Sequence, residues 1–195
     1  MSEFWNKFWA SLIKMSEKEM GHIEFMGLVE LWVMLIIVVQ LVALIKARLC
    51  REKRNLRKEL LVILLGMYAI FMWVLAVQGR IRMPERIVRT NLLWFGSNMD
   101  DNTANLLNVV FFLPFGAMIL LLQDREKGWR RILMTACYSF LMSFSIELQQ
   151  YMLQCGYVEL VDLETNTVGG VLGALCMIAV QKRLAEQRKK REAEE

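Results

Sequence analysis

The sequence predicts an all-α protein that crosses a membrane with about five transmembrane helices. Of its 195 residues, 56% are hydrophobic, whereas about 45–50% is typical of soluble domains. The apolar residues gather in five runs, and most Lys and Arg residues fall in the stretches between these runs. One run also holds a polar stripe around a carboxylate. A chain of this length has room for a single domain, so we expect one helical bundle in a bilayer.

The first segment, residues 1–26, is predicted to be an amphipathic helix at the membrane interface. Its apolar face repeats at helical spacing through Phe4, Trp5, Phe8, Trp9, Leu12 and Ile13. An aromatic face accompanied by a few lysines suits the headgroup region. The segment lacks the basic start and the clean apolar stretch of a cleavable signal peptide. A tail that packs against nothing is the alternative.

Five apolar runs follow, and each is a candidate transmembrane helix. They cover residues 27–45, 60–77, 106–122, 132–153 and 166–180. A spanning helix needs about 20 apolar residues, with a range of roughly 17–25. The third and fifth runs are short on this measure, so both helices must begin in the residues ahead of them.

The connections between the runs predict the direction of each helix. Residues 46–59 hold seven Lys or Arg, residues 123–131 hold four, and the tail at residues 181–195 holds six, whereas residues 154–165 hold none. Cytoplasmic loops carry the excess of basic residues, so the three basic segments should lie in the cytoplasm. The N-terminus and the other connections then face outward. The charged tail should be a solvated helix end or a disordered segment.

One outward connection, residues 78–105, departs from this pattern. It carries four arginines, which are Arg80, Arg82, Arg86 and Arg89. Arginines kept there against the topological bias can bind an anionic group such as a lipid phosphate, or they can simply extend to the headgroups. An apolar patch at residues 87–96 suggests an interfacial or partly re-entrant helix. Pro84 would lie in its first turn, where proline is tolerated.

The most informative side chain is Glu147, which lies inside the fourth run. An ionised carboxylate near the bilayer centre costs roughly 3 kcal/mol on insertion scales. Such residues therefore usually face a protein interior or a wet cavity. On a helical wheel, four further polar residues fall in the same arc: Ser139, Ser143, Gln150 and Gln154. This face indicates a polar site built between helices.

The third run contributes a second polar face. Asn105, Asn108 and Gly116 share one side of the predicted helix. Pro114 lies in the middle of the run and should kink the helix, because proline removes a backbone donor.

The fifth run contributes a third face, made of Asn166, Gly169, Gly170 and Gly173. Gly169 and Gly173 form a GxxxG motif, which lets two helix backbones approach closely. Asp162 and Glu159 stand just ahead of this run. Asn166 can also act simply as the N-cap of the helix, with Thr165 and Asp162 as competitors for that position.

With the predicted orientation, the three faces meet in the outer half of the membrane. We expect Glu147 to accept hydrogen bonds there from Asn108, Asn166 or Gln150. Asparagine and serine in membrane helices can also serve only as hydrogen bonds between helices, worth about 0.6–2 kcal/mol. A carboxylate is a costly way to achieve packing, so Glu147 favours a functional site.

Other kinds of site have little support. The four cysteines, Cys50, Cys137, Cys155 and Cys176, form no CxxC pair, and His22 is the one histidine. We therefore expect no metal site and no cofactor. The basic residues favour membrane lipids as partners. Nucleic acid is not expected, because a binder would carry a basic stripe on a soluble surface.

Several motifs resemble those of the VanZ-like family. The stretch NLLNVVFFLPFGAMILLL (Asn105–Leu122) is similar to the family's Asn-rich, Pro-Gly segment. SFSIELQQ (Ser143–Gln150) resembles its Ser-x-x-Ile-Glu-x-x-Gln signature, and DLETNTVGGVLG (Asp162–Gly173) resembles its Asp-x-x-x-Asn-Thr-x-Gly-Gly signature. Arg89 and Asn91 also fit. The matched positions are Asn105, Asn108, Pro114, Gly116, Ser143, Glu147, Gln150, Asp162, Asn166 and Gly170.

The resemblance covers residues 60–180 and implies a core of four spans in a bacterial cytoplasmic membrane. Residues 27–59 would then be an added first helix with its basic loop. The family often carries an arginine shortly before the acidic run, where this chain has Gly156–Val158. Its named members are linked to low-level resistance to teicoplanin, a lipoglycopeptide, so the resemblance implies a role in the envelope.

Our first hypothesis is an outward-facing polar pocket for a lipid-linked cell-wall intermediate or another lipophilic ligand, a lipoglycopeptide included. Its candidate ligand-binding residues are Arg89, Asn105, Asn108, Ser143, Glu147, Gln150, Asp162 and Asn166. The candidate structural residues are Pro114, Gly116, Gly169, Gly170 and Gly173. We expect Arg89 or Arg86 to meet an anionic headgroup.

Three alternatives stay open. Glu147 could be a general acid or base of an enzyme that acts on lipid or cell-wall intermediates, with Asp162 as a second carboxylate. The chain could be a small proton-coupled transporter, although the inner halves of the spans hold few polar residues and no path through them is visible. It could also be a structural subunit that uses Gly169 and Gly173 to bind a partner.

Overall fold

A computed structural model gives the arrangement of the chain. It describes residues 6–11, 13, 25–49, 55–78, 80, 84–90, 92, 95–96, 98–123 and 128–194. The long helices are α2 (Phe25–Leu49), α3 (Leu56–Trp73), α4 (Met99–Leu122), α5 (Trp129–Leu153) and α6 (Leu160–Glu194). A π-helical turn, η1 (Val74–Gln78), extends α3, and two short strands are β1 (Val88–Arg89) and β2 (Val158–Glu159).

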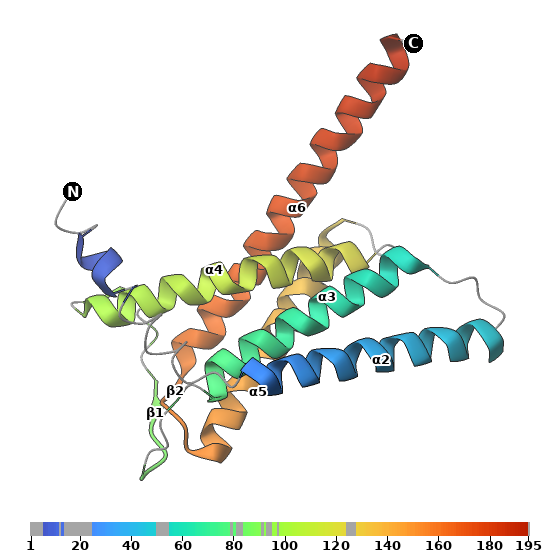
Figure 1. The fold of residues 1–195 in the computed structure, drawn as a ribbon. Coiled ribbons are helices and arrows are strands. Elements are labelled where there is room, and N and C mark those ends of the chain that lie inside the picture. The colour runs from blue at the N-terminus through green and yellow to red at the C-terminus, as the bar shows by residue number, and fades with distance from the viewer. Residues whose placement is uncertain are drawn as a thin grey trace.

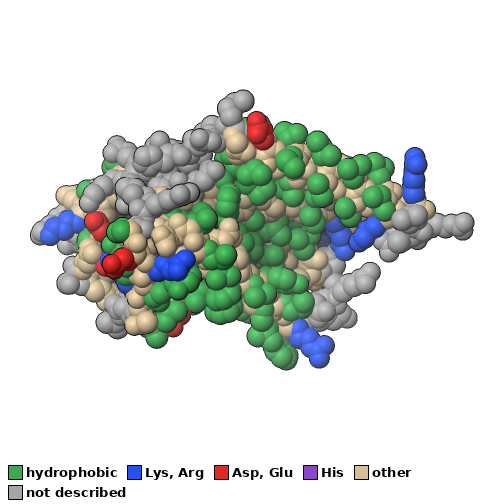
Figure 2. All heavy atoms as spheres, turned by 90° about the horizontal axis from the view of Figure 1, so that it is seen from below, with side chains coloured by type: hydrophobic (Ala, Val, Ile, Leu, Met, Phe, Trp, Pro, Cys, Tyr) green, Lys and Arg blue, Asp and Glu red, His purple; other side chains and the backbone are tan. Residues whose placement is uncertain are grey.

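The predicted fold class is confirmed. Among the described residues, five helices are long and apolar enough to cross a membrane. Figure 2 shows a broad band of hydrophobic side chains across the surface, with most charged side chains toward its ends. Residues such as Met34 (63% exposed) and Leu141 (57% exposed) belong to this apolar surface. A surface of this kind is stable in lipid, where exposed apolar area carries no cost.

The core of the bundle is formed by α4, α5 and α6. α4 makes its largest contact with α6, which also packs against α5, and α3 covers α4 (Figure 1). α2 lies at the periphery against α3, where the Trp32 indole N–H donates a hydrogen bond to the Met67 carbonyl at 3.0 Å. A methyl group on Gly66 would meet the Leu35 side chain, so this contact is close as well.

Three glycines set the distance between α4 and α6. A Cβ at Gly116 would run into the Gly170 carbonyl, and one at Gly173 would run into the Leu113 carbonyl. A Cβ at Gly169 would meet the Val109 carbonyl in the same way. Backbone against backbone is the packing that small residues allow in membrane bundles. The polar faces of the two helices are thereby brought into direct contact.

Pro114 lies inside α4, and the element remains helical on both sides of it. Proline cannot donate to the carbonyl of the preceding turn, and its ring crowds that turn. The Tyr68 hydroxyl of α3 donates a hydrogen bond at 2.7 Å to the Phe111 carbonyl in the same region. Pro114 leaves the Val110 carbonyl without its helical donor, and the Tyr68 contact is made by the next carbonyl along the chain.

α4 begins at Met99, seven residues before the apolar run that predicts it. The Asn98 side chain caps the helix by accepting a hydrogen bond from the Asp100 amide at 3.1 Å. Asp100 and Asp101 lie in the first turn, where acidic groups interact favourably with the helix dipole. The polar first turns of α4 are therefore helical because they are capped, and hydropathy does not explain them.

The N-terminal segment contacts this same helix start. Residues 6–11 are helical, and the Ser11 hydroxyl donates a hydrogen bond to Asp100 Oδ1 at 2.8 Å. Trp9 and Ile13 are exposed. Phe4, Trp5 and Leu12 of the predicted apolar face lie outside the described residues. The segment is thus attached to α4 rather than left without contacts.

α6 also begins earlier than its apolar run, at Leu160. Asp162, Thr165 and Asn166 therefore lie inside the helix, and the prediction that one of them is the N-cap is wrong. At its other end α6 continues through residue 194 and projects from the bundle (Figure 1). The charged tail thus takes the first of its two expected forms, a helix end.

The described residues of the 87–96 patch, which are 87–90, 92 and 95–96, do not form the expected interfacial helix. Val88 and Arg89 instead make β1, which pairs in parallel with β2 at Val158 and Glu159. Pro84 lies in a bend, and Arg82 and Trp94 are outside the described residues. This pairing joins the 78–98 connection to the start of α6, while the apolar side chains of Ile87, Val88, Leu92 and Phe95 are exposed.

Candidate functional site

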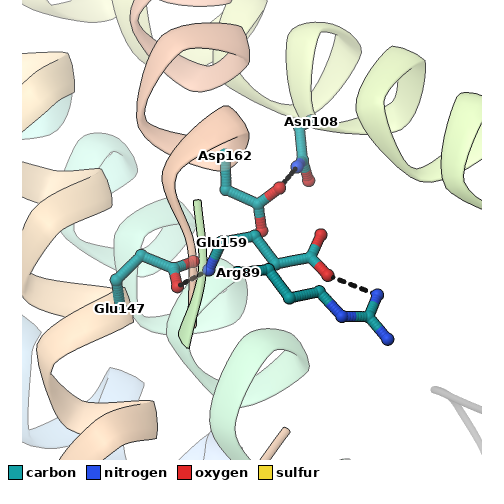
Figure 3. Close-up of polar contacts among 5 residues, drawn as sticks. All are labelled: Arg89, Asn108, Glu147, Glu159 and Asp162. Carbon is teal, nitrogen blue, oxygen red and sulfur yellow. Dashed lines mark hydrogen bonds and ion pairs between the residues drawn. The ribbon is translucent and has the colours of Figure 1, made fainter. Parts of the chain in front are cut away.

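The site is built around two buried carboxyl groups on neighbouring helices. Glu147 of α5 is 4% exposed and Asp162 of α6 is 8% exposed. The two side chains interact directly with each other. Asp162 Oδ1 accepts a hydrogen bond from Asn108 Nδ2 of α4 at 2.9 Å, and Glu147 Oε2 accepts one from the Glu159 amide at 3.1 Å (Figure 3). Three helices and one strand thus meet at this pair.

A tight turn between α5 and β2 places the Glu159 amide against Glu147. Gln154 ends α5 in the left-handed conformation with φ 55°, and Gly156 has φ 84°. Glycine adopts such a positive φ at little cost. The Cys155 amide donates back to the Gln150 carbonyl at 3.0 Å. The chain therefore reverses within a few residues and returns across the end of its own helix.

A second layer of polar groups lies deeper in the bundle. Asn166 Nδ2 donates to Ser143 Oγ at 2.8 Å, and this hydroxyl donates to the Asp162 backbone carbonyl at 3.3 Å. Ser143 has no exposed surface. We call Asn108, Ser143, Glu147, Asp162 and Asn166 the polar cluster. Its members come from all three core helices.

Arg80 is the cation whose charge acts on both carboxyl groups of the cluster. Its side chain packs over Gly156, where a Cβ would meet Arg80 Cδ at 2.7 Å. In the sequence Arg80 is one of four arginines in the 78–105 connection, and it was not predicted to be a site residue. Its position ahead of the third span carried no signal, because the turn that brings Gly156 beneath it is distant in sequence.

Two further arginines lie at the edge of the cluster, each on an aromatic ring. Arg89 forms an ion pair with Glu159 at 2.8 Å, and its guanidinium carbon lies 3.8 Å from the Tyr157 ring centroid. Arg86 lies 5.1 Å from the Tyr151 ring centroid and donates to the Tyr151 carbonyl at 3.3 Å. We call Arg86, Arg89 and these two tyrosines the arginine rim. Arg86, Arg89 and Tyr151 are exposed and Tyr157 is partly exposed, whereas four of the five cluster residues are buried.

The expected hydrogen bonds to Glu147 are not the ones observed. Asn108 donates to Asp162, Asn166 donates to Ser143, and Gln150 Nε2 donates to the Ala76 carbonyl of η1 at 2.9 Å. A helical wheel shows on which face of a helix a residue lies, but not which residue it will contact. The donor to Glu147 is instead the backbone amide of Glu159 in β2. The polar faces of α4, α5 and α6 do meet, as predicted, in the polar cluster. Gln150 does not join them, because its side chain points to η1.

The remaining candidate residues have different positions. Asn105 is buried one turn before Asn108 on α4, and Arg89 reaches the cluster only through Glu159. Two apolar surface grooves run along α5 and α6 and are lined by residues such as Phe140 and Thr167. None of their lining residues belongs to the cluster. Within the described part of the chain, no three His, Cys, Asp or Glu side chains form a metal-binding group.

Comparison with known proteins gives two matches. Residues 60–181, which include most of α3, all of α4 and α5 and most of α6, match the family described as VanZ/LLP1. Over 66 residues the chain is 35% identical to a protein of Enterococcus faecium named Protein VanZ. That alignment covers 34% of this chain and 38% of the relative, so the chain spans well under half of the relative's length. No solved structure matches the chain.

Proposed function

The chain belongs to the VanZ/LLP1 family, and from that premise we propose that its polar cluster binds the headgroup of a lipid or lipid-linked envelope molecule. The observation that carries the proposal is the Glu147–Asp162 pair, buried between two membrane-spanning helices. Ionisable residues at such depth are costly and mark functional sites. A bundle held together only by packing would have no use for two of them side by side.

The charges define the kind of headgroup. The carboxyl groups of Glu147, Asp162 and Glu159 accept hydrogen bonds, so they suit hydroxyl, amide or amine groups of a ligand. Arg80 and Arg89 offer guanidinium groups within the same region, and these suit a phosphate or carboxylate. A headgroup that carries both an anionic group and several donors matches this pattern.

The arginine rim suits a ligand that arrives from the bilayer. Arg89 and Arg86 lie on tyrosine rings at the end of the bundle. Stacking on an aromatic ring holds a guanidinium in place. Arg89 uses Nη1 for Glu159 and Arg86 uses Nε for the Tyr151 carbonyl, and a guanidinium has further N–H donors for an anion. The predicted orientation puts this end outside the cytoplasm, where lipid-linked envelope intermediates and lipoglycopeptides are found. We extend the proposal to low-level protection against teicoplanin.

Inhibition of growth tests this proposal. The chain is expressed in a susceptible Gram-positive host, and inhibitory concentrations of teicoplanin and vancomycin are measured at matched membrane levels. We expect wild type to raise the teicoplanin value selectively and Glu147→Gln to abolish the shift. Glu164→Gln is the matched control, because Glu164 is an exposed carboxylate on α6. No shift with wild type, or a shift that survives Glu147→Gln, would contradict the proposal.

A direct measurement addresses the ligand itself. The purified protein is washed in detergent, and its bound organic phosphate is determined per mole of chain. We expect Arg80→Gln to lower the bound phosphate, because a neutral amide holds a phosphate much less strongly than a guanidinium does. Arg57→Gln, in an exposed turn of α3 at the opposite end, should leave the value unchanged.

A second candidate function is acid–base catalysis on a lipid-linked substrate. The observation in its favour is that the two adjacent carboxyl groups have different partners, one a backbone amide and the other a side-chain amide. Different surroundings can separate an acid from a base within one pair. Glu147→Gln would then abolish the phenotype while bound phosphate stays at the wild-type level, whereas a pure binding site would lose both.

A further inference from the structure

The buried polar side chains do not end at the cluster but continue along α5. Thr135, Ser139, Ser143 and Glu147 follow each other at intervals of four residues, and none is more than 4% exposed. Residues four apart lie on one face of a helix, one above the other. The face of α5 that packs into the bundle is therefore polar over several consecutive turns.

The far end of this face has polar neighbours of its own. Gln123 Nε2, just beyond α4, donates to Thr135 Oγ1 at 3.3 Å, and this hydroxyl donates to the Arg131 carbonyl at 2.9 Å. Arg131 in turn donates to the Leu120 carbonyl at 2.9 Å. We call Arg131, Gln123, Thr135, Ser139 and the polar cluster, together with Gln150 and Arg80, the polar column.

The polar column is long enough to cross the apolar part of a bilayer. Arg131 and Gln150 are 19 residues apart on one helix, which is about 28 Å at 1.5 Å per residue. The hydrocarbon core of a typical membrane is about 30 Å thick. Both ends of the column carry an arginine, Arg131 at one end and Arg80 at the other, as expected for positions near the headgroups.

Unpartnered atoms are concentrated in this column. Within the described residues, six buried side-chain atoms have no hydrogen-bond partner: Arg80 Nε, Gln123 Oε1, Arg131 Nε, Ser139 Oγ, Gln150 Oε1 and Asn166 Oδ1. All six belong to the column. Ser139, Gln150 and Asn166 are themselves more than nine-tenths buried.

Such atoms need partners. Leaving a buried donor or acceptor without one costs about 1–3 kcal/mol, and buried polar groups in proteins are almost always paired with protein or with water. These groups lie on α5 and α6 and in the segments that follow α3 and α4, and bound water can satisfy buried polar groups of this kind. The column therefore has the chemistry of a hydrated path.

We propose that the polar column conducts protons between the Arg131 end of the bundle and the Glu147–Asp162 pair. Successive hydroxyls on α5 are about 6 Å apart, a gap that one water bridges with two hydrogen bonds of about 2.8 Å. The carboxyl pair binds a proton delivered along this path and releases it at the rim, and no other bond is made or broken.

The groups that face the pair fit this role. Arg80 and Glu159 are the charged groups near it, and Asn108, Asn166 and Ser143 are neutral. A hydroxyl donates and accepts at the same oxygen, so the serine and threonine hydroxyls relay a proton without holding a charge in the membrane. The amides of Asn108 and Asn166 hold Asp162 and Ser143 in place by donating to them. The proposal does not depend on the headgroup binding proposed above, because a proton path requires no ligand.

Proton flux into proteoliposomes tests the column. The purified full chain is reconstituted with a pH-sensitive dye inside, and a potassium gradient with valinomycin drives proton entry. We expect wild type to acidify the lumen several-fold faster than protein-free liposomes. Thr135→Val keeps the size of the side chain and removes its hydroxyl, and it should reduce the rate to near that of protein-free liposomes. Glu147→Gln should do the same.

The control is another threonine with the same local bond. Thr167 Oγ1 donates to the Leu163 carbonyl at 2.6 Å, as Thr135 does to its own helix, but it lies on the apolar grooves outside the column. Thr167→Val should keep the wild-type rate. Wild-type flux no faster than protein-free liposomes would overturn the proposal. So would equal rates in wild type and Thr135→Val, or an equal loss in both threonine variants.

Discussion

At the scale of single residues, Asp162 has the most connections in the site. Its carboxylate accepts from Asn108, while its backbone carbonyl accepts from Ser143 and, at 3.3 Å, from Thr165. A buried carboxylate is tolerated only when its lone pairs are satisfied. The position of Asp162 is therefore fixed from three directions, and with it the position of the neighbouring Glu147.

The hydrogen bond between Asn108 and Asp162 can be measured by a double-mutant cycle. Asn108→Leu should destabilise the protein by about 1–3 kcal/mol, because it leaves a buried acceptor without a donor. Asp162→Leu removes the group that needs the donor. The double variant should therefore cost less than the sum of the two single variants. Thermal unfolding in detergent gives these values, and strictly additive costs would contradict the interaction.

Arg89 should hold the two strands together through its ring contact as well as its charge. Arg89→Lys keeps the charge but loses the planar stacking on Tyr157, which is worth about 0.5–1 kcal/mol. We expect faster hydrogen exchange in the peptide covering residues 155–162, measured by mass spectrometry. Arg86→Lys, whose partner Tyr151 lies on α5, should leave that peptide unchanged. Equal exchange in wild type and both variants would show that the ion pair alone suffices.

At the scale of elements, the bundle depends on how closely α4 and α6 approach. Their backbones touch at Gly116 and Gly170, and this contact brings Asn108 within reach of Asp162. A helix pair with larger residues would be separated by side chains, and the hydrogen bond would then be too long. The small residues thus have a direct consequence for the site, several turns away along the helix.

Gly116→Ala tests this spacing. The new methyl group would meet the Gly170 carbonyl, a backbone atom that cannot turn aside. Overpacking of this kind costs about 1–3 kcal/mol, so the unfolding temperature in detergent should fall. Gly27→Ala is the control, since nothing lies within 4 Å of its new methyl group. Alanine there should be neutral or slightly stabilising, and equal effects of the two substitutions would contradict the packing argument.

At the scale of the whole molecule, the number of helices followed from the sequence but several of their ends did not. An apolar run long enough to cross a membrane predicts a spanning helix, whichever other helices pack against it. The start of α4 was missed because Asn98, Asp100 and Asp101 form a helix end through capping, which hydropathy cannot detect. The strand pair was missed because two residues are too few for an alternating pattern and their partner is 70 positions away.

The candidate site, like the helices, could be predicted only in part from the sequence pattern. Helical spacing placed Ser143, Glu147 and Asn166 on faces that converge, because a helix fixes which residues share a side. Arg80 was missed since it lies outside any regular helix and reaches the site through Gly156. Individual hydrogen-bond partners depend on the exact rotation of each helix, which sequence periodicity does not determine.

The orientation in the membrane is a prediction at this scale. The basic segments at residues 46–59 and 123–131 and the charged tail should lie in the cytoplasm. A fluorescent-protein fusion at the C-terminus should therefore fluoresce, and an alkaline phosphatase fusion after Asn98 should be active. A phosphatase fusion after Gln123 should be inactive. The reverse pattern would contradict both the orientation and the outward position of the arginine rim.

α6 is a single helix of 35 residues that contains Asp162 in its first turn and Arg191 in its last. At 1.5 Å per residue it is about 50 Å long, and its final turns stand outside the bundle (Figure 1). An unbroken helix resists twisting and compression, so a turn or shift imposed on its charged end also moves the carboxylate at the other end. The charged tail and Asp162 belong to one continuous helix, so with the predicted orientation a movement of the tail in the cytoplasm is expected to reach the carboxylate on the outer side.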